Sequence, residues 1–519
     1  MKKICSLAIL SVFLCAISGN AATITATGSG GWYSTAPDSP WPGGVVPAAT
    51  DDAIITSGVQ VSSAVTINNL TINGGGTFFN SGVLTVSGDL TLGGTVHVQE
   101  GAAINIAGNL NIGSNTQFDP SCFSFSVGGT TSVSGTLVDL CGGSGLVDVL
   151  ADVTVNAGGQ WKLTDVTQWS VSGNVINNGS ITATTGEITF TGSGKTISGN
   201  AFSIGGMAVS GSVENDTAVT LTGRLSGFGT LKQGTNSTLN LGFLVTISSL
   251  DASAVPNTVN YNSTGAQSIV GSSYYNLNLS GGNTKTLANS TAIGGDVHVF
   301  SPARANFNAT VTVAGTTTVD SGATLSGIGT LNGAVTVNGT VSPGVTIGVL
   351  TLGSTPTLNG TNLMQINRTN APTSDQLAVS GQPVVYGGTL TVQNLGPALV
   401  AGDTFQLFSA SGYSGAFTTV TLPTLGANLA WTNTLAANGT ISVFSTASPG
   451  SPRLTNSVSG GNLILSWNTG GFPGFALQGQ TNAGGLGANW DVVPGGNVSP
   501  FSIPFDRANR SVFFRLYKP

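Results

Sequence analysis

A 20-residue internal repeat constrains the fold of this chain more than any other feature. The ten residues from Leu84 match the ten from Ile104, with their apolar and Gly positions in register, and the segment 225–231 recurs at 325–331. Each unit contains short apolar runs that end at Gly, Asn or Ser, and such a unit cannot bury a core alone. Repeats of this length form a core when they stack, which predicts a parallel β-solenoid.

Strict alternation of apolar and polar residues indicates strands rather than helices. Val311-Thr-Val313 and Val335-Thr-Val337 show it directly. Charged residues make up only 7% of the 519 residues, and 76 residues are Gly. A solenoid explains the low charge, because Thr, Ser and Asn can keep its outer face wet, whereas like charges stacked in successive coils would repel. We therefore expect an all-β chain with almost no helix.

The composition changes along the chain and predicts its domain boundaries. Lys2 and Lys3 precede an apolar run and small residues that end at Ala21, the pattern of a cleaved signal peptide. No later run is long and apolar enough to span a bilayer, so we expect a secreted or cell-surface protein without a transmembrane segment. The predicted parts are a signal peptide (1–21), an N-terminal cap (22–54), a parallel β-helix of about 20 residues per coil (55–353), a C-terminal cap or β-domain (354–444), a linker (445–452) and a small antiparallel β-sandwich (453–519).

The charge is distributed unevenly between these parts. Residues 22–452 carry a net charge of −11, whereas residues 453–519 carry +3. Nucleic-acid binding requires a basic face, so we expect no nucleic-acid partner for the body of the chain. The basic terminal residues fit either a solvated strand face or contact with an anionic envelope surface.

The segment Thr316–Leu352 resembles the autotransporter-associated β-strand repeat, most clearly at Val319–Leu331 and Val341–Leu352. The region from Asp375 to Phe417 is similar to the end of such passenger domains, and Trp32–Ile55 to the start of secreted bacterial β-helices. The resemblance implies a right-handed parallel β-helix in a bacterial surface protein, and its motifs are structural rather than chemical.

Few residues could carry catalytic or metal chemistry. The two histidines, His97 and His298, lie between valines, so both should face outward if the valines face the core. They are 201 residues apart, about ten coils, which is too far for a shared site. The close acidic pairs are Asp51/Asp52, Asp148/Asp152 and Glu214/Asp216. The last pair precedes Arg224 by about half a coil and is the best candidate for acid–base catalysis on a polysaccharide.

Cys122 and Cys141 are 19 residues apart, close to one coil. Stacked positions would bring their Cα atoms to roughly 4.8 Å, within disulfide range, so we predict a possible disulfide, with two free thiols as the alternative.

These observations favour a structural or adhesive β-helical protein that acts through an extended polar surface, with glycans or other envelope or matrix components as partners. We expect no cofactor, no bound metal and no catalytic activity. The alternative is a polysaccharide lyase or hydrolase on the same scaffold. Thr-rich strands at 316–318 and 389–391 are also compatible with an ice- or crystal-binding face, although Thr is common on any wet strand.

Overall fold

The computed structural model describes residues 21–74, 77–94, 97–100, 102–119, 123–139, 147–163, 168–183, 185–447 and 450–518, with only the backbone at 77–80, 97–100 and 139. The chain forms two compact units. Unit 1 comprises Met1–Pro397, Thr404–Thr424 and Asn433–Ser442, and unit 2 comprises Ala398–Asp403, Leu425–Thr432 and Val443–Pro519. The predicted signal peptide lies outside the described residues except for Ala21.

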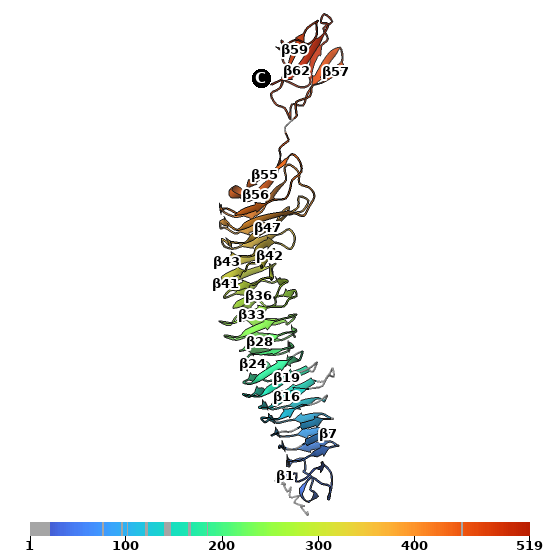
Figure 1. The fold of residues 1–519 in the computed structure, drawn as a ribbon, viewed down its shortest axis with the longest axis vertical. Coiled ribbons are helices and arrows are strands. Elements are labelled where there is room, and N and C mark those ends of the chain that lie inside the picture. The colour runs from blue at the N-terminus through green and yellow to red at the C-terminus, as the bar shows by residue number, and fades with distance from the viewer. Residues whose placement is uncertain are drawn as a thin grey trace, which may run out of the picture. The chain divides into compact units, whose positions relative to one another are not determined.

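Unit 1 is a parallel β-helix whose coils stack three ladders of short strands (Figure 1). The first ladder consists of β1 (Thr23–Thr25), β3 (Asp52–Ile55), β6 (Leu70–Ile72), β9 (Leu90–Leu92), β12 (Leu110–Ile112), β15 (Thr131–Val133), β18 (Val153–Val155), β21 (Val175–Asn177), β24 (Ser193–Gly199), β27 (Ser212–Asn215), β30 (Thr230–Gln233), β32 (Ser249–Ala252), β35 (Ser273–Tyr274), β38 (Thr291–Ile293), β41 (Thr310–Val319), β43 (Thr330–Val337), β45 (Val349–Leu352), β48 (Gln376–Val379) and β52 (Phe408–Ser409).

The second ladder shares the long strands β41 and β43 with the first. Its other strands are β2 (Gly30–Gly31), β4 (Val59–Val61), β7 (Thr77–Asn80), β10 (His97–Glu100), β13 (Gln117–Phe118), β16 (Thr136–Asp139), β19 (Gln160–Leu163), β22 (Ser180–Ala183), β25 (Phe202–Ile204), β28 (Ala218–Leu221), β31 (Thr238–Leu241), β33 (Thr258–Tyr261), β36 (Asn276–Leu279), β39 (Val297–Val299) and β46 (Thr357–Leu358).

The third ladder is interrupted and forms two separate sheets, with an isolated bridge between Leu225 and Val245 at the interruption. The first sheet contains β5 (Val65–Ile67), β8 (Leu84–Val86), β11 (Ile104–Ile106), β14 (Phe125–Val127), β17 (Val147–Leu150), β20 (Gln168–Val171), β23 (Glu187–Phe190), β26 (Gly206–Val209) and β29 (Leu225–Ser226). The second contains β34 (Gln267–Ser268), β37 (Thr284–Leu287), β40 (Arg304–Phe307), β42 (Thr324–Gly327), β44 (Thr340–Pro343), β47 (Thr361–Ile366), β50 (Thr389–Asn394) and β54 (Thr419–Thr421).

The 20-residue repeat is confirmed as the register of the coils. Leu84 pairs with Ile104 between β8 and β11, and Leu90 pairs with Leu110 between β9 and β12. The inward residues of these strands are almost fully buried, whereas the residues between them face outward. Burial of these stacked Val, Ile and Leu side chains, at ~25 cal/mol per Å2 of apolar surface, is the main force that holds the coils together.

The parallel ladders extend beyond residues 55 and 353 on both sides. Thr23 in β1 already pairs with Asp52 in β3, and Leu390 in β50 still pairs with Val420 in β54. The coils near the C-terminal end contain longer loops, which explains why the 20-residue period fades there. At the N-terminal end Trp32 and Trp41 are buried against each other, with ring centroids 4.8 Å apart.

The remaining elements of the solenoid region are short. β51 (Thr404–Gln406) pairs antiparallel with β56 (Thr440–Ser445), β49 (Val384–Tyr386) pairs parallel with β53 (Tyr413–Gly415), and Tyr386 donates a hydrogen bond to the carbonyl of Leu435 (2.9 Å). The other elements are the 3-10 turn η1 (Pro42–Gly44), the helix α1 (Leu435–Asn438) and β55 (Leu429–Thr434).

The end of unit 2 consists of two antiparallel three-stranded sheets, as the sequence predicts. One contains β57 (Thr455–Ser459), β58 (Asn462–Ser466) and β61 (Phe501–Pro504), and the other contains β60 (Asp491–Val492), β59 (Ala476–Thr481) and β62 (Val512–Tyr517). Leu465, Trp467 and Leu477 form the buried core between them. We refer to Arg453–Lys518 as the terminal domain.

Candidate functional site

The Gly-Asx-apolar motif of the repeat forms a ladder of side chains at one corner of the coils. Asp89 Oδ1 accepts hydrogen bonds from the backbone N–H of Asn109 (2.7 Å) and from its amide Nδ2 (3.1 Å), while Asn69 Oδ1 accepts the N–H of Asp89 (2.8 Å). Asp152 and Asp296 accept the N–H of Asn174 and Thr316 in the same way, at 2.7 and 2.8 Å. These carboxylates therefore fasten one coil to the next.

A second ladder of polar side chains lies on the outer face of the second strand ladder. Asn240 donates to Thr220 Oγ1 (2.9 Å), Asn260 to Asn240 Oδ1 (2.7 Å) and Asn278 to Asn260 Oδ1 (2.8 Å). Thr220, Asn240, Asn260 and Asn278 are paired in register across β28, β31, β33 and β36, and all are partly exposed. We call these four residues the amide ladder. Sequence inspection missed it, although the 20- and 18-residue spacings of its Asn residues carry the signal.

His298 continues the line of the amide ladder, because it pairs with Asn278 in register. Val297 and Val299 are buried and His298 faces outward, as predicted from the flanking valines. Its Nε2 lies 2.8 Å from Asp320 Oδ1, and its ring stacks on Phe300 with centroids 3.8 Å apart. The side chain of His97 lies outside the described residues. The ladder places ten strand-to-strand steps between the two histidine backbones.

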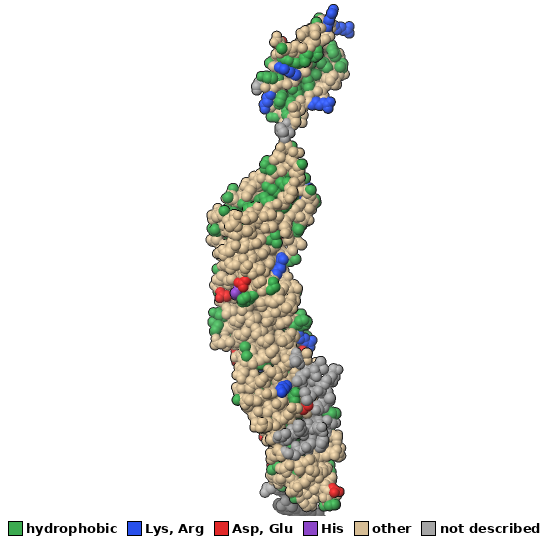
Figure 2. All heavy atoms as spheres, in the orientation of Figure 1, with side chains coloured by type: hydrophobic (Ala, Val, Ile, Leu, Met, Phe, Trp, Pro, Cys, Tyr) green, Lys and Arg blue, Asp and Glu red, His purple; other side chains and the backbone are tan. Residues whose placement is uncertain are grey.

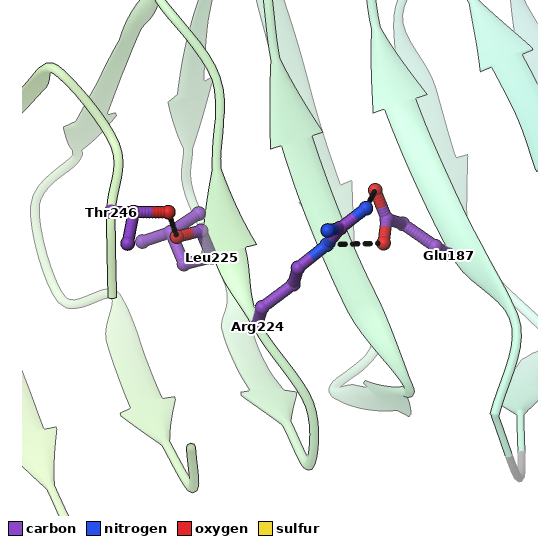
Figure 3. A network of polar contacts seen from close by, with 4 residues as sticks. All are labelled: Glu187, Arg224, Leu225 and Thr246. Atoms are coloured by element: carbon purple, nitrogen blue, oxygen red, sulfur yellow. Dashed lines mark hydrogen bonds and ion pairs between the residues drawn. The ribbon is translucent and has the colours of Figure 1, made fainter. Parts of the chain in front are cut away.

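Arg224 directly precedes β29 of the third ladder, whereas Glu214 lies in the first ladder. Glu214 is in β27 and pairs in register with Lys232 of β30. Arg224 instead binds Glu187, with Nε 3.0 Å from Oε2 and the terminal nitrogen 3.4 Å from Oε1 (Figure 3). This ion pair spans Gly206 of the intervening coil, where a Cβ would lie only 3.1 Å from Glu187 Oε2. Arg224 therefore has Glu187 as its ion-pair partner, and not a member of the candidate pair Glu214/Asp216.

The other two acidic pairs hold the backbone. Asp51 accepts the N–H groups of Ala22 (3.0 Å) and Ala48 (2.8 Å), and these two hydrogen bonds lower the pKa of its carboxyl. Asp52 accepts the N–H of Asn69 (3.2 Å). Asp148 points inward in β17 and is fully buried, and its Oδ1 accepts the N–H of Phe125 (3.1 Å). These contacts indicate that both acidic pairs hold loops and neighbouring coils in place.

Two fully buried side chains, Lys285 and Asp375, were not predicted from the sequence, because strand alternation alone does not show that a charged residue is buried. Lys285 points into the core from β37 and donates to the carbonyls of Ser263 (2.6 Å) and Gly265 (2.8 Å). Burial lowers the pKa of its ammonium to about 8. Burial raises the pKa of Asp375 to about 7, although its carboxyl accepts the N–H groups of Gly348 and Gln365.

The Thr-rich strands form only part of the flat array that a crystal-binding face requires. Thr317 is fully buried because the alternation turns it inward, so Thr316, Thr317 and Thr318 do not share a face. Thr389 and Thr391 do share a face and pair in register with Thr419 and Thr421. The outer surface seen in Figure 2 is mostly uncharged.

No group of three or more His, Cys, Asp or Glu side chains that could hold a metal ion occurs among the described residues. Cys122 and Cys141, the predicted disulfide pair, both lie outside the described residues. Within the same described ranges, no helix is long and apolar enough to cross a membrane.

Comparisons with known proteins give structural likenesses only. No family model matches the sequence, and no curated protein matches it. Among solved structures, the chain is similar to the Hap adhesin of Haemophilus influenzae, with 12% sequence identity and a TM-score of 0.31. The match covers 78% of this chain and 65% of the Hap chain, so it spans slightly less than two thirds of that structure.

Proposed function

We propose that this protein is a secreted or cell-surface β-helical protein with a structural and adhesive role, and that it acts through its extended polar surface. The amide ladder is the observation that carries the proposal. Its side chains repeat at about the 4.8 Å strand spacing, and each Asn uses only part of its hydrogen-bonding capacity within the ladder. A row of free amide donors and acceptors at a fixed spacing is suited to the hydroxyl and amide groups of glycans or other envelope and matrix components.

The use of the acidic residues supports binding rather than catalysis. Asp52, Asp89, Asp152 and Asp296 accept backbone N–H groups of the next coil, and Glu187 is paired with Arg224. A glycosidase needs two carboxyl groups free to act on one bond. We therefore propose that the protein binds its partner without turnover.

The test is a binding and turnover assay with the full chain on a glycan array and on immobilised matrix components. The informative variant is the triple change Asn240→Ala, Asn260→Ala and Asn278→Ala, and the matched control is Thr324→Ala, Thr340→Ala and Thr361→Ala on the outer face of the third ladder. Circular dichroism checks that both variants fold. We expect binding without product release, weakened at least tenfold by the Asn changes and less than twofold by the Thr changes.

Two results would overturn the proposal. One is the absence of binding to every surface tested, and the other is depolymerisation of a polysaccharide by the unmodified chain.

A further inference from the structure

The terminal domain leaves much of its apolar core uncovered. Only Leu465, Trp467 and Leu477 form its buried core, and seven apolar side chains packed around them are just partly buried: Leu454, Leu463, Val493, Phe501, Ile503, Phe514 and Leu516. Five of these seven line a cleft of about 720 Å3 between the two sheets. That volume falls within the roughly 300–1,000 Å3 of small-molecule sites. The cleft therefore has the size and apolar floor of a ligand site.

Two edge strands beside the cleft, β60 and β61, are poor templates for another strand. β61 ends at Pro504 and is preceded by Pro500, and proline has no N–H to donate. β60 is only two residues long. Short edges and edge prolines are devices that prevent strand addition. An extended peptide is therefore a poor occupant at these two edges, whereas the side chains that line the cleft are available for recognition.

The rim of the cleft combines uncommitted charges of both signs. Asp491 and Arg510 both line it, and neither side chain makes a hydrogen bond or ion pair with any residue that the structure describes. The carboxyl of Asp506, also on the rim, is engaged by the N–H of Ala508 (2.9 Å) and the amide of Asn509 (3.0 Å). The rim thus offers a carboxylate acceptor and a guanidinium donor to a ligand, with little net charge.

These features select among ligand classes. A polyanion would meet the carboxylates of Asp491 and Asp506, and a fatty acyl chain would leave the polar rim without partners. A sugar matches both parts, because its ring presents apolar C–H faces to the Phe501 and Phe514 side chains and hydroxyls to Asp491 and Arg510. We propose that this cleft binds a neutral oligosaccharide. The inference rests on the proposed adhesive function and gives it a second, compact binding site.

The experiment is a calorimetric titration of the full chain with cellotetraose, xylotetraose, mannotetraose and maltotetraose. The test variants are Arg510→Gln and Asp491→Asn. The matched control is Arg507→Gln, which lies in the same turn but does not line the cleft. All three side chains are exposed, so folding should be unaffected. We expect one site per chain for at least one of these sugars, with affinity reduced at least tenfold by each test variant and less than twofold by the control.

The inference is overturned if none of the four sugars binds or if binding is insensitive to Arg510→Gln and Asp491→Asn. Its failure can be told apart from failure of the proposed function. Tetrasaccharide binding that survives the amide-ladder triple variant reports the cleft alone, whereas surface adhesion that survives Arg510→Gln reports the solenoid alone.

Discussion

Arg224 Nε lies 3.0 Å from Glu187 Oε2, although the two residues are 37 positions apart and a complete coil lies between them. Gly206 occupies that coil at the crossing point and leaves the space that the two side chains need. The ion pair therefore depends on the register of three successive coils, and it makes Glu187 the acidic partner of Arg224.

Double-mutant cycles should show which acidic residue interacts with Arg224. Because Arg224 is more than half exposed, we expect Glu187→Gln and Arg224→Met to couple by only about 0.5 kcal/mol in unfolding experiments, and less at high salt. Glu214→Gln and Arg224→Met should be additive. Coupling between Glu214 and Arg224 larger than that of the Glu187 cycle would contradict the structure.

The ladder of Asp and Asn side chains at the corner of the coils predicts different effects for two substitutions of Asp89. Asp89→Asn keeps the Oδ1 acceptor for the N–H of Asn109, so it should change the free energy of unfolding little. Asp89→Ala removes this acceptor and should destabilise by ~1–3 kcal/mol. Hydrogen exchange of the Asn109 amide is the local readout, and equal protection in the two variants would show that the ladder contributes nothing.

Two glycines of the 100-residue echo should not tolerate a side chain. Gly227 and Gly327 have φ angles of 111° and 120°, and a Cβ at either would overlap the carbonyl oxygen of the coil below, that of Val209 or Phe307. We expect Gly227→Ala or Gly327→Ala to destabilise by more than the ~1 kcal/mol cost of backbone conformation alone. Gly194→Ala is the control, since Gly194 has φ 67° but no atom within 4 Å of the added Cβ. Equal losses of thermal stability in all three would refute the steric argument.

Lys285 predicts a stability change at alkaline pH. Its pKa falls from 10.5 to about 8 in the folded chain, so between these values the unfolded chain binds more protons than the folded chain. The free energy of unfolding contributed by this group therefore rises with pH through that window. The melting temperature of the unmodified chain minus that of Lys285→Met should therefore rise from pH 7.5 to pH 10. A constant difference would mean that Lys285 is not desolvated.

The sequence by itself determined the solenoid, because each sequence feature that specifies it is local and repeated. Alternation sends Leu84, Val86, Ile104 and Ile106 inward whatever their neighbours are, and the Gly-Asx step recurs wherever a coil turns that corner. The outward position of His298 between two buried valines follows from the same alternation. The antiparallel sheets after the linker-like segment could be predicted for similar reasons, since their strands are marked by short apolar runs and turns.

Only the tertiary structure decided which polar groups meet, because coil lengths vary. Asn278 follows Asn260 by 18 residues and Asn260 follows Asn240 by 20, so a fixed period does not bring side chains into register, whereas backbone pairing does. Tertiary packing also pairs Arg224 with Glu187 instead of Glu214, and it buries Lys285 in β37, within the second sheet of the third ladder. The cleft of the terminal domain is likewise a product of how two sheets pack, a long-range relationship that local sequence periodicity does not encode.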